Sequence, residues 1–431
     1  MADRQFPPLR SGILDRFGRR LDGSRFYRLL LVAALLGLAV GSVAAGFRTA
    51  WLFAKHHLWA TFPALYWRIP ISALAGLVIG GIYHLTFYPG ALSALIEQFH
   101  TDGQVPLDEI VPALPAGWLG LITGQTIGPE GVMSIGGGSF RTYLAGSFTL
   151  DSAKKLLTLA GMGAGFGTIL GAPIGGAMIW LEMPHDRGVE YYEAIVPTLV
   201  ASFAGYLLVV TVGGLSLFPT WNAESIVPID PGQLFVAIAV GAVCIPLAVF
   251  YTRLFGAVGR VFQWWSPAVY VRTTVAGLAF GTLGFLIPLT YFYGGSQINA
   301  VLTGSFTLPV LGAILLGDML AAAISVQGNW IGGLIVPHMF MGSVIGRAAA
   351  VVVPGIAPAA GMLAGMAAFN AAVTGTPLSS ALIAIALTNG AGVTPAFLAS
   401  LTAFLASPSI GFLEETAPRS ESPGLHIAED D

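Results

Sequence analysis

Residues Thr123–Gly138 read TGQTIGPEGVMSIGGG, and Gly128 in this stretch falls on Gly332 when the chain is shifted by 204 residues. The shifted partner, Asn329–Pro337, reads NWIGGLIVP and has the same glycine-led turn into an apolar run. The offset also aligns, without a gap, Gly80, Gly90 and Gly124 with Gly284, Gly294 and Gly328, Ala160-Gly161-Met162 with Ala364-Gly365-Met366, and Gly171-x-Pro173 with Gly375-x-Pro377. Duplication inside an apolar chain is typical of transporters and channels whose substrate site lies between two halves.

The composition predicts a membrane protein. Hydrophobic residues make up 55% of the 431 residues and charged residues 10%, against about 25% charged in ordinary soluble domains. Long apolar runs, several of which reach the roughly 20 residues that a membrane span requires, begin at Leu29, Ile69, Lys154, Val189, Pro231, Ala268, Leu308 and Ile331. Shorter runs broken by Gly and Pro predict re-entrant or broken helices: Val111–Ile127, Pro358–Val373, Thr376–Leu387 and Pro395–Ala406. The expected fold class is an all-α polytopic membrane protein.

The distribution of arginine predicts the orientation of the chain. Seven arginines precede Leu29, so the segment 1–28 is expected to remain cytoplasmic, whereas the linker 214–230 contains no Lys or Arg and is expected outside. The first membrane repeat, 29–213, therefore begins inside and ends outside. The second repeat, 231–409, must then be inverted, with a short acidic cytoplasmic tail at 410–431. We expect two inverted-topology repeats of tilted and re-entrant helices in the inner (plasma) membrane, with a site near the midplane.

The glycine-led turns predict an anion site. Pro129 suits the first position of a helix, and the helix that follows Gly128 begins with amides that have no acceptor one turn earlier. A helix start of this kind carries partial positive charge and binds anions. Inverted symmetry would direct both helix starts at one point, so that backbone amides replace the hydration of a small anion. The candidate anion-binding residues in the two turns are Gly128, Gly131 and Val132, and Gly333, Leu334 and Ile335.

Glu130 lies where that anion should bind. A carboxylate in a largely apolar segment is unfavourable and suggests a functional role. The alternative is a helix-capping glutamate in the first turn, which stabilises an exposed helix by roughly 0.3–1 kcal/mol. One residue can satisfy both interpretations if its carboxylate occupies the anion site and leaves that site when protonated.

Three motifs together resemble the CLC family of chloride channels and chloride/proton antiporters. The family's Gly-basic-Glu-Gly-Pro turn is similar to Gly128-Pro129-Glu130-Gly131-Val132, and its Gly-Gly-Ile-Phe-x-Pro motif is similar to Gly332–Pro337. A Gly-Ala-Pro turn into an apolar helix that ends in Glu-Glu resembles Gly171–Met183. The resemblance extends from about Leu29 to Ser409 in the right order. It implies a homodimer of inverted repeats in which Glu130 is the external gate and proton acceptor.

Several positions depart from the family's motifs. The resemblance places Asp102–Pro106 at the first anion motif, so Gly103 stands where the family has a serine, and Gln104 follows it. Ile410 is nearest to the family's second hydroxyl, a tyrosine. The internal proton glutamate is replaced by Met183, and Glu182 is adjacent but about 100° round the helix. Backbone amides are then the main anion donors, which favours low selectivity among small anions. Unless Glu182 acts as the inner proton carrier, no inner carboxylate is present, which favours passive or loosely coupled flux.

Two further buried candidates are Asp318 and His338. Asp318 either pairs internally or lines a pathway, with a paired structural role favoured, and His338 is expected to be a satisfied core histidine. The seven histidines show no metal-ligand spacing, and no cofactor motif is present. A net charge of −3 does not indicate a nucleic-acid partner.

The predicted function is passage of a small inorganic anion, with chloride first, gated by Glu130 and with or without proton coupling. The alternatives are a passive channel or a transporter of another anion, such as fluoride or nitrate. An intramembrane enzyme is less favoured, because His-Glu-x-x-His and Gly-x-Ser-x-Gly are both absent and an aspartyl protease would need a second membrane aspartate.

Overall fold

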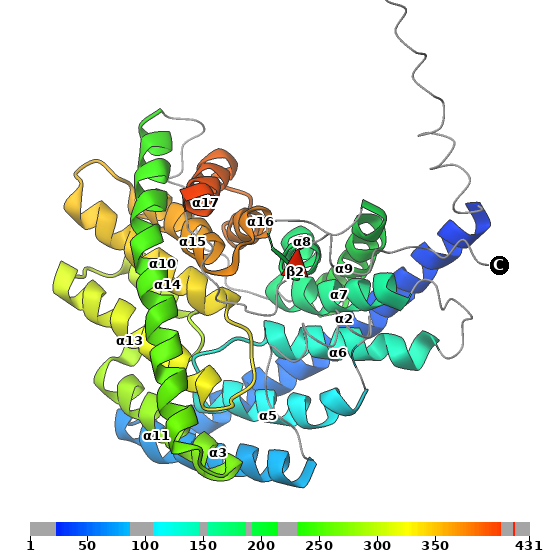
Figure 1. Cartoon of the computed structure of the whole chain (residues 1–431), viewed down its shortest axis with the longest axis horizontal. Coiled ribbons are helices and arrows are strands. Elements are labelled where there is room, and N and C mark those ends of the chain that lie inside the picture. Colours follow the sequence, from blue (N-terminus) through cyan, green and yellow to red (C-terminus); the bar gives the residue numbers. More distant parts are fainter. Residues whose placement is uncertain are drawn as a thin grey trace, which may run out of the picture.

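The computed structural model describes residues 23–86, 105, 107–145, 154–186, 192–213, 231–406 and 417–418. Within these ranges the regular secondary structure is helical except for two paired two-residue strands (Figure 1). The first-repeat elements are α2 (Gly23–Thr61), η1 (Leu65–Trp67), α3 (Arg68–Thr86), η2 (Leu107–Glu109), α5 (Ile110–Thr123), α6 (Glu130–Ala145), α7 (Lys154–Leu170), α8 (Pro173–Glu182), β1 (His185–Asp186) and α9 (Tyr192–Gly213). The second-repeat elements are α10 (Pro231–Trp265), α11 (Val269–Leu286), η4 (Pro288–Thr290), α12 (Gln297–Thr303), α13 (Leu308–Gln327), α14 (Ile335–Val352), α15 (Pro358–Thr374), α16 (Pro377–Leu387) and α17 (Val393–Ala406), and β2 is Ala417–Pro418.

The 204-residue offset holds for the helices as it does for the sequence. Adding 204 to the bounds of α7 gives 358–374, which are the bounds of α15, and adding it to the last residues of α2 and α5 gives the last residues of α10 and α13. Gly171 and Gly375 each adopt a left-handed φ, of 69° and 71°, and a proline begins the next helix two residues later. Left-handed glycine ends a helix and proline suits the start of one, so both halves break at the same Gly-x-Pro turn.

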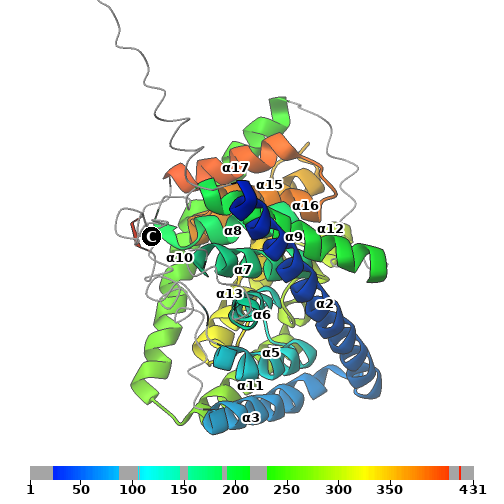
Figure 2. The ribbon, with the colours of Figure 1, turned by 90° about the vertical axis from the view of Figure 1, so that its right-hand side faces the viewer.

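Equivalent elements of the two repeats contact each other, as a pseudo-two-fold axis requires. α3 packs along α11, and the two lie side by side at one end of the molecule (Figure 2). Their axes approach closely because small residues face across the contact, and the Thr273 hydroxyl donates to the Gly76 carbonyl at 2.6 Å. α8 likewise packs against α16. The expected inverted-repeat architecture is confirmed.

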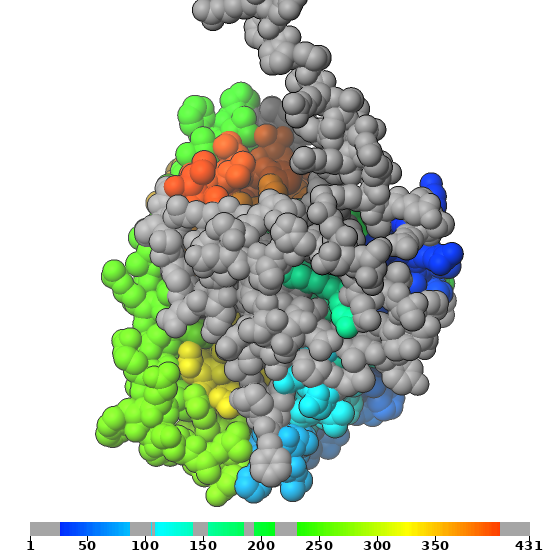
Figure 3. Space-filling model, turned by 45° about the vertical axis from the view of Figure 1, so that its right-hand side comes forward, coloured from blue at the N-terminus to red at the C-terminus, as the bar shows by residue number. Residues whose placement is uncertain are grey.

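Burial separates central helices from peripheral ones. Residues 156–170 of α7 and 359–373 of α15 are buried all round, so these helices form the middle of the molecule. α2 and α10 lie at opposite edges in the space-filling view (Figure 3) and expose large apolar side chains, among them Phe53 and Phe235. In the part of the chain that the structure describes, seven helices are long and apolar enough to cross a membrane, so the predicted polytopic membrane fold is confirmed.

The structure adds detail to two sequence expectations, and other expectations concern residues that the structure does not describe. The run Pro358–Val373 was expected to be short or broken; it is short, at 17 residues, and forms one unbroken helix, α15. The segment after α8 pairs in parallel with part of the tail, through β1 and β2, so residues 417–418 are held against the membrane body. The linker 214–230 and the start of the chain lie outside the described residues, as do Gly90, Gly103, Gln104 and Ile410 among the residues named above.

Candidate functional site

The two glycine-led turns meet at one point. The Gly128 amide donates to the Gly333 carbonyl at 2.7 Å, and the Gly333 amide donates to the Gly128 carbonyl at 2.8 Å. α6 begins two residues after the first glycine and α14 two residues after the second. A Cβ on Gly131 would lie 2.6 Å from the carbonyl carbon of Gly332, which is closer than side-chain carbons approach. Only glycines allow the two helix starts to come this near, so the predicted convergence of α6 and α14 is confirmed.

A glycine that leads a turn is expected to supply a backbone conformation that other residues avoid, but Gly128 has a different role. Its φ is not in the left-handed range, so the turn itself does not require glycine. A Cβ there would instead overlap the carboxylate of Glu130. Gly128 therefore provides the space into which the Glu130 side chain folds.

The Gln125 side chain donates hydrogen bonds to both turns, a contact that the sequence analysis did not predict. Its Nε2 donates to the carbonyls of Ile127 and Ile331, each at 3.1 Å. Those two residues are 204 positions apart, so one side-chain amide satisfies equivalent carbonyls of both repeats. Buried carbonyls without donors are unfavourable, and this side chain therefore stabilises the junction at which α6 and α14 begin.

The Glu130 carboxylate lies at the start of α14 rather than only at the start of its own helix. The residue is fully buried, and its Oε1 accepts a hydrogen bond from the Val336 amide at 3.3 Å. The Ile335 amide and the residue's own amide also donate to the carboxylate. Its Oε2 has no hydrogen-bond partner among the described residues. A negative side chain from one repeat thus occupies the positive helix end of the other.

The other predicted residues lie around this contact. Val132 is fully buried on α6, and Leu334 is the residue at which the helical turn of α14 begins. Among the residues predicted in the second turn, Ile335 donates its amide to the Glu130 carboxylate. The other amide donor of α14 is that of Val336, one residue beyond the predicted set. A shift of one residue is within the usual uncertainty of a helix start.

Tyr293 is a neighbour of Glu130 that the sequence analysis missed, and Arg48 is in turn a neighbour of Tyr293. Tyr293 follows η4 in the second repeat and interacts electrostatically with both Glu130 and Arg48. Its ring also contacts that of Trp51, with centroids 5.6 Å apart. The family's tyrosine lies near the C-terminus, so motif comparison could not indicate a hydroxyl from this segment.

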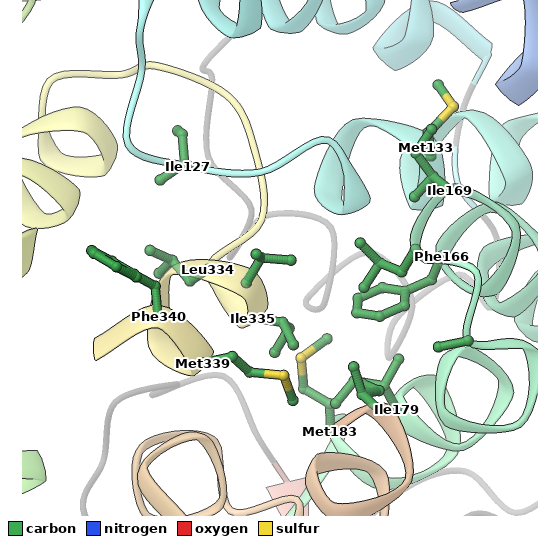
Figure 4. Close-up of a cluster of buried hydrophobic side chains, with 14 of the residues drawn as sticks. Ile127, Met133, Phe166, Ile169, Ile179, Met183, Leu334, Ile335, Met339 and Phe340 are labelled. Carbon is green, nitrogen blue, oxygen red and sulfur yellow. The ribbon is translucent and has the colours of Figure 1, made fainter. Parts of the chain in front are cut away.

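An apolar cluster surrounds the start of α14 (Figure 4). Met183 and Ile179, at the end of α8, lie with Ile335 and Met339 of α14, and Phe166 of α7 completes this side. All of them are buried. Met183, which the motif resemblance places at the family's internal proton glutamate, is therefore an apolar contact beside the site.

The Glu182 side chain points to the start of α16 and caps that helix. Its Oε1 accepts from the Leu378 amide at 3.0 Å, and its Oε2 accepts from the Ser379 amide at 2.8 Å and from the Ser379 hydroxyl. Donors at a helix start satisfy a carboxylate and are satisfied by it. Because Leu378 lies 196 residues further along the chain, this contact joins the two repeats.

We expect Glu182→Gln to lower the free energy of unfolding by about 1–3 kcal/mol, since the amide group cannot accept both backbone hydrogen bonds and leaves a buried donor unsatisfied. Thermal unfolding in detergent would measure the change. Asp108→Asn, at an exposed position in η2 just before α5, is the control and should leave the midpoint unchanged. An unchanged midpoint in Glu182→Gln would rule out the capping role.

A sequence model of the voltage gated chloride channel family matches residues 76–408, more than three quarters of the chain. The chain belongs to this family. Membership agrees with the resemblance that the three motifs imply, and the match includes most of both repeats and the two turns at the site.

Individual members of the voltage gated chloride channel family resemble the chain along most of its length. A chloride/fluoride channel protein of Pseudomonas syringae pv. tomato is 26% identical, covering 89% of this chain and 84% of its own. A voltage-gated ClC-type chloride channel of Escherichia coli O9:H4 (strain HS) is 27% identical, covering 86% and 93%.

Solved structures share the fold. That of a CLC-type fluoride/proton antiporter superposes with a TM-score of 0.80 at 18% identity, covering 91% of this chain and 98% of the other. That of a slow cyanobacterial chloride/proton antiporter has a TM-score of 0.73 at 22% identity, covering 92% and 96%.

Proposed function

We propose that the protein carries small halide ions, chloride and fluoride, across the membrane in exchange for protons, with Glu130 as the gate. The observation that carries the proposal is the Glu130 carboxylate on the Ile335 and Val336 amides, because a carboxylate and a halide need the same donors. Membership of a channel and transporter family and the seven apolar spans among the described residues support transport rather than catalysis.

The transport cycle follows from competition for these amides. Ionised Glu130 fills the start of α14 and excludes an anion. When its carboxylate takes up a proton it loses its charge, and its attraction to the helix end falls. The side chain then leaves, and a halide replaces it on the same donors. Return of the carboxylate releases the proton and expels the ion, so anion and proton movements are linked.

Backbone donors set the selectivity. Amides replace hydration of any small anion, and they discriminate by size and field strength rather than by a specific side-chain ligand. With Gly103 at the family's serine position, we infer that chloride and fluoride are both accepted. The names of two similar proteins, a chloride/fluoride channel and a fluoride/proton antiporter, support the inclusion of fluoride.

Flux measurements on proteoliposomes test this proposal. We expect chloride, fluoride and nitrate each to drive proton movement, reported by a pH-sensitive dye, with initial rates within about tenfold of one another, which corresponds to site preferences below about 1.4 kcal/mol. Liposomes without protein give the background. Strong preference for chloride alone would contradict the account of selectivity, and absence of anion flux would contradict the proposed function.

A passive channel is the second candidate. The apolar cluster around Met183 favours it, since the family's internal proton glutamate has no counterpart there. The two candidates differ in one result: an antiporter drives protons uphill when an anion gradient is imposed, whereas a passive channel does not.

We further propose that the chain forms a homodimer in the inner membrane, with both termini cytoplasmic. The family resemblance supports this assembly and orientation. Large apolar side chains exposed on α9 and α17, Leu207 at 61% and Leu405 at 78%, are suited to lipid or to a second copy. Cross-linking in native membranes would show whether the chain runs as a dimer.

A further inference from the structure

A cavity of about 530 Å³ lies between the end of α2 and the start of α3. Its walls come from the last three turns of α2, the turn that follows, Arg68 and Phe292. Three of the described residues that line it are basic, Lys55, His56 and Arg68, and none of them is acidic. Cavities of about 300–1,000 Å³ typically hold organic ligands. This cavity is therefore suited to an anion much larger than a halide.

The cavity lies where the chain meets the membrane surface. One apolar span ends at Thr61 and the next begins at Leu65, so the turn between them joins two spans. The end of α2 and the start of α3 meet at the end of the molecule where α3 runs along α11 (Figure 2). Phospholipid headgroups lie at this level of a bilayer, at the boundary of its hydrocarbon core.

Lys55 brings a positive charge to the cavity without a counter-ion. Its Nζ lies 3.6 Å from the centroid of the Phe292 ring, which Trp59 contacts edge-on with centroids 6.0 Å apart. The ring face attracts the ammonium but does not neutralise its charge. None of the described carboxylates interacts with it. A cation in a half-buried, partly apolar wall is unfavourable unless it is paired, so a bound anion would stabilise it.

Arg68 supplies the second positive charge, and its guanidinium is held in place. Its Nη1 donates to the carbonyls of Gly284, at 2.5 Å, and Pro288, at 3.2 Å, and the group lies over the Tyr291 ring, 4.7 Å from its centroid. These contacts orient the guanidinium but leave its charge, and none of the described carboxylates pairs with it. Three of its five N–H groups remain for a ligand, in a planar geometry that matches phosphate oxygens.

The wall of the cavity continues into the apolar surface of α2. Leu52 lines the cavity and is 38% exposed, and the next residue, Phe53, is 65% exposed. A soluble anion in the cavity would leave this apolar surface uncovered. A ligand with a charged head and apolar chains satisfies the cations and covers the apolar side chains together.

We propose that this cavity binds an anionic phospholipid, with its phosphate between Lys55 and Arg68 and its acyl chains along Leu52 and Phe53. A net negative lipid is favoured over a zwitterionic one, because a choline group would add positive charge beside two unpaired cations. The bound lipid holds the end of α2 against the start of α3. The inference does not depend on which ion the protein carries.

Binding of defined lipids to the purified protein in detergent tests the proposal. The probes are phosphatidylglycerol and, with the same acyl chains, phosphatidylcholine, and native mass spectrometry counts the bound molecules. We expect wild type to retain phosphatidylglycerol in preference to phosphatidylcholine. Lys55→Gln should weaken phosphatidylglycerol binding about fivefold or more, because it removes one cation near the headgroup. Lys55→Arg should retain it, and so should the control Arg260→Gln, at an exposed position of α10 outside the cavity lining.

Thermal unfolding gives a second readout, in which phosphatidylglycerol should raise the midpoint of wild type more than that of Lys55→Gln. Glycerol 3-phosphate has the charged group without the chains, and at equal concentration it should not displace the lipid. Its displacement of the lipid would show that the cavity binds soluble phosphates, and would overturn the inference. Equal affinity of wild type for the two lipids, or unchanged phosphatidylglycerol binding in Lys55→Gln, would overturn it as well.

Discussion

Replacement of Glu130 with glutamine abolishes proton movement and leaves halide flux equal to or greater than that of wild type. Glutamine cannot take up and release a proton, and it carries no charge with which to compete for the Ile335 and Val336 amides. Glu130→Ala should act in the same direction and raise the flux further, because it also empties the space beside Gly128.

The measurement is the initial rate of halide and proton movement in proteoliposomes with an imposed halide gradient. Asp108→Asn makes the same change from acid to amide in an exposed residue and should behave as wild type. Proton movement that persists unchanged in Glu130→Ala would exclude Glu130 as the proton acceptor.

The second large effect is expected at Gly131, where alanine should reduce halide flux by tenfold or more. The added Cβ would lie 2.6 Å from the carbonyl carbon of Gly332, and backbone on both sides leaves no flexible side chain to move. Overpacking of this kind costs about 1–3 kcal/mol, and about 1.4 kcal/mol is a tenfold change in an equilibrium constant. Separation of the two helix starts would remove the shared site.

Gly312→Ala is the matched control for this prediction. A Cβ at that position of α13 meets nothing within 4 Å, so flux should not change. Gly332→Ala approaches the same contact from the second repeat, with its Cβ 2.8 Å from the Gly128 carbonyl oxygen, and should resemble Gly131→Ala. Normal flux in both site variants would show that the junction is not the anion site.

The duplication was predictable from sequence because both halves use the same local signals. Gly171-x-Pro173 and its partner place a left-handed glycine before a helix-starting proline, and that pattern depends on neighbouring residues alone. Glu130 was predictable for a related reason. A carboxylate beside a glycine turn in an apolar segment is rare, and inverted symmetry indicates what it faces.

Long-range contacts could not be predicted in the same way. The hydrogen bond from Gln125 to Ile331 depends on how the repeats pack, and so does the capping by Glu182 of a helix 196 residues further along the chain. Asp318 shows the limit most clearly. Its apolar surroundings suggested a paired carboxylate, and only the packing of α10 and α14 on α13 shows that none of the described residues donates a hydrogen bond to it.

The central claim is that the Glu130 carboxylate and the transported halide compete for the amides at the start of α14. Calorimetric titration of the purified protein with fluoride and with chloride, at a series of pH values, tests it most directly. Protonation releases the carboxylate from the amides, so wild type is predicted to bind halide more tightly as the pH falls. Glu130→Gln is predicted to bind tightly at every pH. Equal halide affinity of the two proteins across the whole pH series would contradict the account.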